Sequence, residues 1–306
     1  MRTMKLGSSD LKVPVIAVGC MRLSMITKAE AAVFLNSAIE QGANFFDHAD
    51  IYGGGASESL FGEALPMTAG LRDRIILQSK CGIVRGKMFD FSTQHILVSV
   101  DGILQRLKTE YLDVLLLHRP DALVEPDEVA AAFTQLKNSG KVRHFGVSNQ
   151  NPMQIQLLQK SLPQQLIVNQ LQLSIAHASM ITAGINVNTV NDSAINRDGS
   201  ILDFCRLHDI TVQNWSPLQY GMFQGTFIDS DKFPELNAKL NEIAARHGVK
   251  SATIAIAWLL RHPAHMIPVT GTTNVKHLRE CTKAAEVTLT REEWYEIYKS
   301  AGNKLP

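Results

Sequence analysis

Short apolar runs alternate with amphipathic stretches about eight times along this chain of 306 residues. The first run is "VIAVG" at residues 15–19, a central one is "LDVLLLH" at 112–118, and the last is "MIPVT" at 266–270. The runs are apolar throughout, which is typical of parallel strands that are covered on both faces. Because each run precedes a helical pattern, the alternation predicts an α/β fold built on a parallel sheet.

Eight strand–helix units in a chain of this length predict a closed (β/α)8 TIM barrel. A doubly wound open sheet is the alternative, but "GCMRLS" (19–24) follows the first strand where that fold would carry G-x-G-x-x-G. No linker or low-complexity segment divides the chain, so we expect residues 1–306 to form a single domain. The least regular stretch, residues 176–200, is expected to be a functional or mobile loop, or else a tolerated surface insertion.

Capping signals predict several helix boundaries. Thr27 and Glu30 have the spacing of a capping box at the start of the first helix. The next helix is expected to be capped at Ser57, and a later one to have Asp127 as its N-cap. One long helical region is expected over residues 234–262.

Charge and cysteine content argue against several classes of protein. Thirty basic and 29 acidic residues give a formal net charge of +1, so we expect neither a nucleic-acid nor a membrane partner. No apolar run approaches the ~18 residues of a membrane span, and the N-terminus lacks the apolar core of a secretory signal. We therefore expect a cytoplasmic protein with reduced thiols and no metal site, since no metal-ligand spacing occurs. Its four cysteines, expected to be buried, are Cys20, Cys81, Cys205 and Cys281.

Polar or aromatic side chains occupy the C-terminal ends of the predicted strands. Tyr52 lies just beyond one of these ends, and the end positions themselves are Asp47, Lys80, His118, Ser148, Asn149, Gln170 and Trp215. In a barrel of parallel strands these ends converge on one rim, where the active sites of this fold are found.

Four of these residues have the chemistry of a proton-transfer group. A tyrosine with a pKa near 10 is a poor acid or base at neutral pH, but a nearby ammonium such as that of Lys80 lowers this pKa. Asp47 would keep Lys80 charged and oriented, and His118 would hydrogen-bond a substrate oxygen. Each residue alone also fits a structural role in a salt bridge or core. Their joint position on one rim with Tyr52 favours catalysis.

Seven blocks, in order and at family-like spacing, give the chain a resemblance to the aldo-keto reductases. They are "FFDHADIYG" (45–53), "SK" (79–80), "LDVLLLHRPD" (112–121), "GKVRHFGVSN" (140–149), "NQLQLS" (169–174), "WSPL" (215–218) and "IPVTG" (267–271). The chain most resembles bacterial members whose active-site turn reads Asp-His-Ala-Asp-Ile-Tyr-Gly-Gly. The resemblance implies a TIM barrel with an N-terminal β-hairpin cap and a C-terminal helix.

The same resemblance implies an NADPH-dependent reduction of aldehyde or ketone carbonyls to alcohols. Tyr52 would be the general acid, assisted by Lys80 and Asp47, with His118 orienting the carbonyl. Asp50 is not one of these four residues, and we expect it to cap a helix or to lie in solvent. The walls of the substrate pocket are expected in loops 21–26, 83–91 and 218–230.

A nicotinamide dinucleotide bound without a Rossmann fold is the implied cofactor. Ser148, Asn149 and Gln170 would bind its carboxamide, and Trp215 would stack on the nicotinamide ring. The remaining implied cofactor-binding residues are Met21, Arg22 and Asp47 at the nicotinamide end, Ser216, Pro217, Leu218, Gln219 and Phe223 along the pyrophosphate, and Gly271, Thr272, Thr273, His277 and Arg279 around the adenosine.

The adenosine block departs from the family pattern. Many members have Lys-Ser where Gly271-Thr272 stand, and Arg where His277 stands, and these residues bind the 2′-phosphate. Lys276 and Arg279, with His277, replace that charge only in part. We therefore expect NADPH as the cofactor, with NAD possible.

Two other functions fit parts of the pattern. One is a barrel that holds NADPH and reports its redox state to a partner protein. The other is a phosphate-binding isomerase, disfavoured because "NWSPL" and "IPVTG" stand where Gly-rich phosphate loops would follow the last two strands. For the leading interpretation, the partner is a small carbonyl compound, and the protein is a monomer or a weak homo-oligomer.

Overall fold

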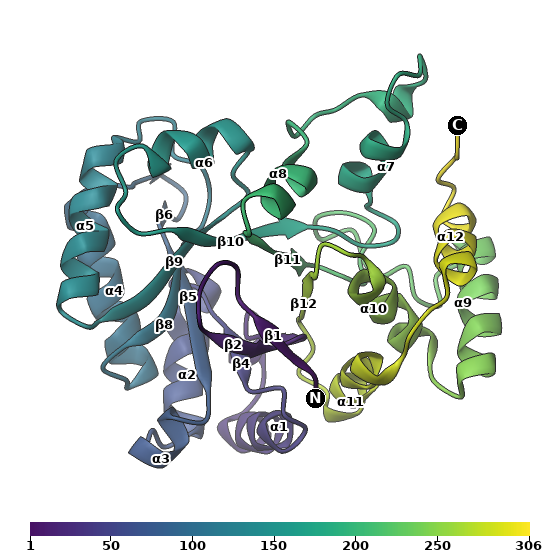
Figure 1. Ribbon diagram of the computed structural model, residues 1–306. Helices are drawn as coiled ribbons and strands as arrows, with labels where there is room; N and C mark the ends of the chain where they lie inside the picture. Colours follow the sequence, from purple (N-terminus) through teal and green to yellow (C-terminus); the bar gives the residue numbers. More distant parts are fainter.

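The computed structural model describes residues 1–306 and contains a closed barrel of eight parallel strands. In space the strands follow the order β10-β11-β12-β3-β4-β5-β8-β9 (Figure 1). The predicted TIM barrel is thus confirmed. The strands are β3 (Ala17–Gly19), β4 (Phe45–Asp47), β5 (Ile76–Cys81), β8 (Leu112–Leu117), β9 (Val142–Ser148), β10 (Leu166–Gln172), β11 (Thr211–Trp215) and β12 (Ile267–Thr270).

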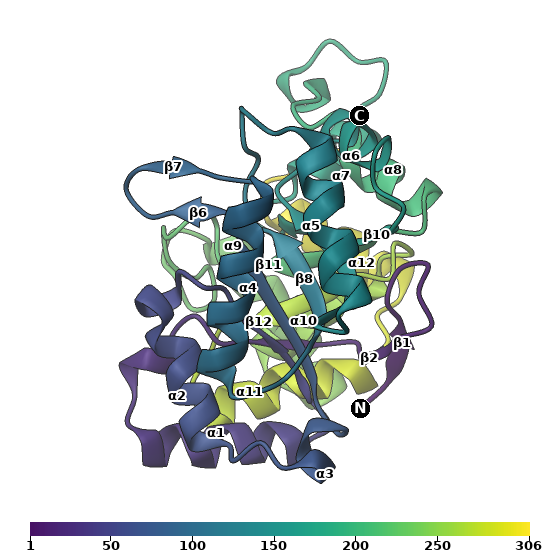
Figure 2. The same ribbon diagram turned by 90° about the vertical axis from the view of Figure 1, so that its left-hand side faces the viewer.

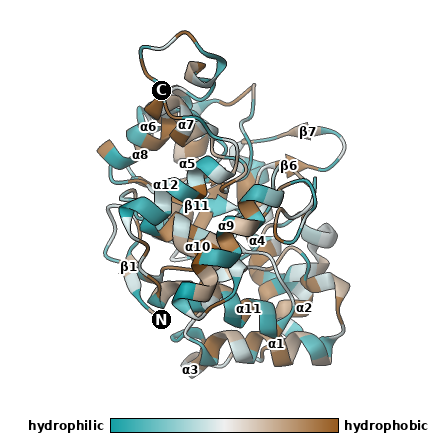
Figure 3. Cartoon of the chain, turned by 90° about the vertical axis from the view of Figure 1, so that its right-hand side faces the viewer, coloured by the Kyte–Doolittle hydropathy of each residue, from teal (hydrophilic) through white to brown (hydrophobic).

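Helices form the outer layer of the barrel. The helices are α1 (Lys28–Glu40), α2 (Ala56–Ala64), α3 (Ala69–Arg72), α4 (Thr93–Leu107), α5 (Pro126–Asn138), α6 (Pro152–Gln159), α7 (Ser179–Ile185), α8 (Ile201–Leu207), α9 (Pro234–His247), α10 (Ser251–Arg261), α11 (Val275–Thr282) and the C-terminal α12 (Arg291–Ser300). Along helices such as α1 and α9 hydrophilic and hydrophobic stretches alternate (Figure 3), as expected where an apolar face packs inward and a polar face meets water.

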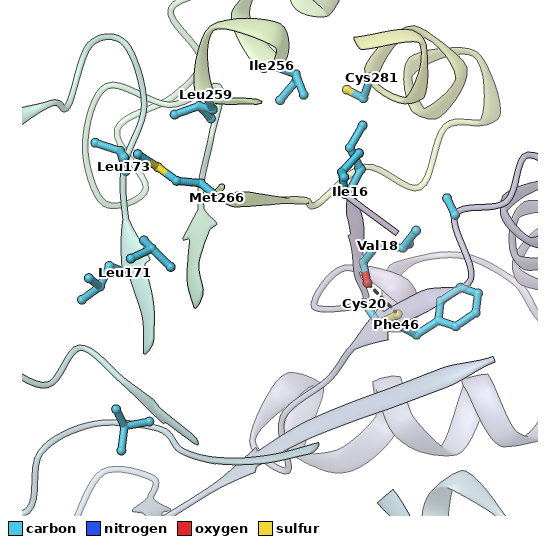
Figure 4. Packing of buried hydrophobic residues seen from close by; sticks show 14 of the residues in the cluster. Ile16, Val18, Cys20, Phe46, Leu171, Leu173, Ile256, Leu259, Met266 and Cys281 are labelled. Carbon is cyan, nitrogen blue, oxygen red and sulfur yellow. Dashed lines mark hydrogen bonds between the residues drawn. The ribbon is translucent and has the colours of Figure 1, made fainter. Parts of the chain in front are cut away.

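The larger hydrophobic core lies between the strands and this helical layer. It comprises 67 buried residues, and Figure 4 shows part of it, with Ile16 and Val18 near strand β3 and Ile256 and Leu259 on α10. Every residue of β8 is buried, as its mainly apolar sequence predicts for a strand covered on both faces. The four cysteines are buried and unpaired, as expected from the sequence.

The N-terminal hairpin closes one end of the barrel. Its strands β1 (Thr3–Lys5) and β2 (Lys12–Pro14) pair antiparallel and lie across the barrel in Figure 1. Leu6 and Val13 join a second core of 10 buried residues inside the barrel. Gly7 is needed here, because its φ is +55° and a Cβ would lie 2.3 Å from the carbonyl oxygen of Ile167. The expected hairpin cap is present, so the barrel opens only at the opposite end, where the strands finish.

Two predicted helix starts are wrong. The helix expected at Asp127 begins at Pro126 with Glu125 as N-cap, because proline fits the first helical position, whose N–H needs no partner. The α2 helix follows a left-handed Gly55, and Ser57 does not cap it; its buried hydroxyl donates to the Met21 carbonyl oxygen at 3.2 Å. The Thr27–Glu30 capping box is present as predicted.

The region 234–262 is two helices rather than one. Gly248 ends α9 in the left-handed conformation (φ +64°), and α10 starts at Ser251. The irregular stretch 176–200 contains α7 and a 3₁₀ turn (Asp192–Ala194). A second hairpin, β6 (Ile83–Val84) with β7 (Met88–Phe89), projects from the barrel after β5 (Figure 2). None of the helices has the length and apolar character that a membrane-spanning segment needs.

Candidate active site

The four residues of the predicted proton-transfer group meet at the open end of the barrel. Asp47 ends β4, Lys80 lies in β5, His118 follows β8, and Tyr52 begins the 3₁₀ turn after β4. Lys80 Nζ lies 2.8 Å from each Asp47 carboxylate oxygen and 3.1 Å from the Tyr52 hydroxyl. The ammonium also donates to the His48 carbonyl oxygen at 2.7 Å. A buried cation is therefore shared between a carboxylate and a phenol.

Opposing effects act on the pKa of Tyr52. Burial raises this pKa, while the Lys80 ammonium and its hydrogen bond lower it. Burial is the larger effect, so the pKa ends above its ordinary value. The net depression that the sequence suggested is thus wrong, although Lys80 acts in the expected direction. Tyr52 is protonated at neutral pH, the state that a proton donor requires.

His118 stands beside the tyrosine. The two rings are arranged edge to face, with centroids 5.9 Å apart. Burial, together with the Lys80 and Arg119 cations, holds the His118 pKa well below its usual range, so the ring is neutral at pH 7. Its Nδ1 is buried without a hydrogen-bond partner. A neutral imidazole keeps one N–H, which can serve as a donor to a substrate oxygen.

A layer of glutamine side chains inside the barrel donates hydrogen bonds to Asp47. Gln78 and Gln170 donate to Asp47 Oδ1 at 2.6 and 3.0 Å. Both also donate to Gln213 Oε1, at 2.8 and 2.9 Å, and Gln213 donates back to Gln78 at 3.0 Å. Sequence reasoning missed Gln78 and Gln213. Their spacing of two residues from Lys80 and Trp215 was an available signal, because residues i and i+2 of a strand face the same side.

A second polar cluster lies behind the turn that carries Tyr52. Glu58 is fully buried, and it accepts hydrogen bonds from Ser79 Oγ at 2.6 Å and from Arg106 Nε at 2.8 Å. Arg106 passes directly over Gly55, where a Cβ would lie 2.9 Å from Arg106 Cδ. The cluster ties α2 and α4 to the strand that carries Lys80.

Asp50 belongs to this buried region, and the expectation of helix capping or solvation is wrong. Its Oδ1 is buried without a hydrogen-bond partner. Burial, followed by the nearby Glu58 carboxylate, raises the pKa of Asp50 to about 7, although Arg106 and Lys80 act against this rise. The pKa of this carboxyl in the folded protein therefore lies above that of an aspartate in the unfolded chain.

We expect Asp50→Asn to become progressively more stable than the wild type as pH rises from about 4 to 7. A carboxyl whose pKa is higher in the folded than in the unfolded chain stabilises the fold at low pH, and this stabilisation is lost as pH rises through the folded pKa. Asparagine has the same shape without the titration. Urea unfolding at pH 5 and pH 8 should show the difference in unfolding free energy growing by roughly 1–2 kcal/mol. The exposed Asp231→Asn is the control, and a pH-independent difference for Asp50→Asn would contradict the expectation.

The residues expected around a nicotinamide lie on neighbouring strands of the mouth. Trp215 is half-buried, and its Nε1 donates to Asn149 Oδ1 at 3.1 Å. Asn149, in the left-handed region (φ +58°), donates to Ser148 Oγ at 2.8 Å and to the His118 carbonyl oxygen at 3.4 Å. Ser148 Oγ in turn donates to the Gln170 carbonyl oxygen at 2.9 Å. These side chains thus form one hydrogen-bonded row that leads to the indole.

The other residues of the expected cofactor path fall into two groups. Arg22, half-buried beside Met21, donates to the Gly271 carbonyl oxygen at 2.8 Å and so joins the nicotinamide end to the adenosine block. The second group follows β11 and contains Ser216, Pro217, Leu218, Gln219 and the exposed Phe223.

The adenosine block leads into helix α11. Thr272 and Thr273 are half-buried, while Lys276, His277 and Arg279 are exposed on the helix. Asn274 Oδ1 accepts hydrogen bonds from the backbone N–H groups of Lys276 and His277. These two N–H groups already have a hydrogen-bond partner. The charged side chains of the helix are therefore the groups that could bind a phosphate.

The fold and the buried lysine–carboxylate–tyrosine group place the chain in the class of α/β-barrel oxidoreductases. Residues 15–301 match the Aldo/keto reductase family model, and the chain belongs to this family. It is 35% identical over 280 residues to the 6-dehydroglucose reductase of Agrobacterium fabrum, covering 88% of this chain and 87% of that protein.

Solved structures agree with this assignment. The thermostable aldo-keto reductase Tm1743, in complex with the inhibitor epalrestat, is similar with a TM-score of 0.78 at 27% identity, covering 98% of this chain and 100% of the other. An aldo-keto reductase from Klebsiella pneumoniae in complex with NADPH also gives a TM-score of 0.78, covering 99% of this chain and 96% of the other. Its 24% identity supports the fold alone.

Proposed function

We propose that this chain is an NADPH-dependent reductase that converts aldehyde or ketone carbonyls to alcohols, with Tyr52 as the general acid. The observation that carries the proposal is the position of Lys80 Nζ between the Asp47 carboxylate and the Tyr52 hydroxyl. A hydroxyl held against a buried ammonium at the mouth of the barrel is suited to give up a proton. The name of the Agrobacterium relative, a reductase of 6-dehydroglucose, supports carbonyl chemistry.

Each residue has a defined part in this reaction. A reduced nicotinamide, when bound, supplies the hydride to the carbonyl carbon. Tyr52 donates its proton to the carbonyl oxygen as negative charge develops there, and His118 donates a hydrogen bond to the same oxygen. Lys80 stabilises the phenolate that Tyr52 becomes, because an adjacent cation favours the ionised form. Asp47 keeps the ammonium in place.

The side chains at the mouth fit a nicotinamide. Both hydrogens of Gln170 Nε2 are donated within the protein, to Asp47 and Gln213, while its Oε1 accepts no hydrogen bond there. That oxygen is suited to accept an N–H from a carboxamide. The half-buried Trp215 supplies an aromatic surface for stacking. The side-chain amide of Asn149 already donates two hydrogen bonds and accepts one, so a bound carboxamide would have to replace one of these partners.

We expect NADPH to bind at least ~10-fold more tightly than NADH, a difference of about 1.4 kcal/mol. Lys276 and Arg279 are exposed, form no ion pair, and stand three residues apart on α11, so both can face the 2′-phosphate. Dissociation constants can be measured by the quenching of Trp215 fluorescence. Trp258 and Trp294 stack on each other within the core, with ring centroids 4.7 Å apart, and are not expected to respond.

Replacing Lys276 and Arg279 together by methionine should shrink the difference between the two cofactors without changing NADH binding. The matched control replaces Lys5 and Arg74, which are exposed near the closed end of the barrel, and removes the same charge. Trp215→Leu should abolish most of the quenching. Equal affinities for NADPH and NADH in the wild type would show that no phosphate site exists, and the enzyme would then be dual-specific.

The test of the function itself is a panel of aldehydes and ketones with NADPH and NADH in parallel, followed by the loss of reduced-nicotinamide absorbance. Multiple turnovers support the reductase. Tight NADPH binding without turnover would favour the redox-sensing alternative instead. We also propose that residues 1–306 act as a single domain and as a monomer or weak homo-oligomer, which light scattering during gel filtration would check.

A further inference from the structure

Arg119 is a charged residue at the mouth of the barrel that the mechanism does not use. It directly follows His118 and is half-buried, yet its guanidinium donates no hydrogen bond and forms no ion pair within the protein. Its guanidinium carbon lies 5.8 Å from the centre of the Trp215 indole ring. Pro120 comes next in the chain and restricts Arg119 to an extended backbone. The guanidinium therefore extends across the mouth of the barrel toward Trp215, the residue expected to stack on the nicotinamide.

The protein supplies no anion to this cation. The Asp47 carboxylate is bound by Lys80, and both oxygens of Asp121 accept backbone N–H groups, from Leu123 and Phe91. Partial burial lowers the pKa of Arg119, which reflects the cost of removing its charge from water. Partly buried charges are normally paired in folded proteins, so an unpaired arginine in a site indicates that a ligand provides the partner.

The position of Arg119 relates this ligand to the substrate. Tyr52 and His118 mark where the carbonyl oxygen binds, and Trp215 marks the cofactor side. Arg119 is adjacent to His118 in the chain, and its guanidinium lies over the Trp215 ring. A group attached near the carbonyl would therefore reach the guanidinium while the carbonyl oxygen contacts Tyr52.

We propose that Arg119 recognises a carboxylate on the substrate, so that aldehydes or ketones carrying a carboxylate are the preferred substrate class. The proposal rests on the function proposed above. A guanidinium matches a carboxylate with two parallel hydrogen bonds. One unpaired cation also balances the single charge of a carboxylate, whereas a phosphate carries nearly two.

The experiment compares 2-, 3- and 4-carboxybenzaldehyde with their methyl esters, which have nearly the same shape but no charge. For at least one positional isomer, we expect kcat/KM of the wild type to be about tenfold or more higher for the acid than for the ester. Arg119→Met should collapse this ratio toward one, mainly by raising KM for the acid, and Arg119→Lys should restore part of it. Arg74→Met, at the other end of the barrel, is the control and should leave the ratio unchanged.

The outcomes separate this inference from the proposed function. An active wild type with equal kcat/KM for all acids and esters refutes carboxylate recognition but leaves the reductase intact. If Arg119→Met lowers kcat/KM equally for the acid and the ester and also weakens NADPH binding, Arg119 contacts the cofactor, and the inference is overturned. If the wild type reduces none of the compounds, the proposed function fails. Benzoate binding, followed by tryptophan fluorescence in wild type and Arg119→Met, then tests carboxylate recognition by itself.

Discussion

Tyr52→Phe is expected to lower kcat for carbonyl reduction by roughly 10²-fold or more, the scale on which a general acid contributes. The substitution removes only the hydroxyl that Lys80 contacts at 3.1 Å and keeps the ring that packs against His118. The affinity for the cofactor should barely change, because the lost hydroxyl faces the substrate. Steady-state turnover at saturating cofactor, combined with a fluorescence titration, measures both quantities.

Tyr298→Phe is the matched control for the loss of a tyrosine hydroxyl. Tyr298 lies on α12, and its hydroxyl donates to Thr182 Oγ1 at 3.0 Å, outside the mouth of the barrel. This control should keep wild-type turnover. Near-wild-type turnover in Tyr52→Phe, under conditions where the chemical step limits the rate, would remove Tyr52 from the role of acid.

Lys80→Met is expected to reduce turnover on a similar scale and to change its dependence on pH. The ammonium lowers the pKa of Tyr52 against the effect of burial, so its removal moves that pKa further up. Activity that needs a protonated tyrosine falls as pH rises through this pKa. The alkaline decline in the pH–rate profile should therefore move to higher pH, while the maximum rate falls because the acid is weaker. An unchanged profile would show that Lys80 does not tune the acid.

The same substitution should also destabilise the fold by about 3–5 kcal/mol, the usual cost of leaving one partner of a buried ion pair alone. Asp47 would keep its hydrogen bonds from Gln78 and Gln170 but would lose its cation. The double variant Asp47→Asn/Lys80→Met has no buried charge at this position and should regain part of the lost stability. Chemical denaturation of both variants measures this, and equal stability of the two would contradict the ion-pair explanation.

The barrel could be predicted from the sequence because its signal is local and repeated. The strand β8 is apolar at nearly every position, and β4, β5 and β8 end at or next to Asp47, Lys80 and His118, which brings these side chains to one rim. Given parallel strands, the meeting of these three residues with Tyr52 follows from topology alone. No knowledge of side-chain packing was needed for that step.

Features that depend on distant partners could not be predicted. Glu58 is paired with Arg106, 48 residues later, and a local pattern shows only an ordinary acidic helix residue. His48 directly follows Asp47 in the sequence, yet it packs edge-on against Phe61, and burial lowers its pKa to about 3. The boundary between α9 and α10 at Gly248 could not be recognised, because helical periodicity continues on both sides of it. In each case the deciding factor is burial or a long-range contact.

The glutamine layer beneath Asp47 has a consequence for how new specificities can arise in this protein. Its hydrogen bonds run between strands on opposite walls, from β4 and β5 to β10 and β11, and none of the bonds to the Asp47 carboxylate comes from a βα loop. Loops such as 83–91 can then be exchanged or lengthened without moving Asp47 or Lys80. Substrate range and the buried ion pair are separable traits in such a barrel, so chimaeras with an exchanged loop 83–91 should change which carbonyls are accepted while keeping the Asp47–Lys80 pair intact.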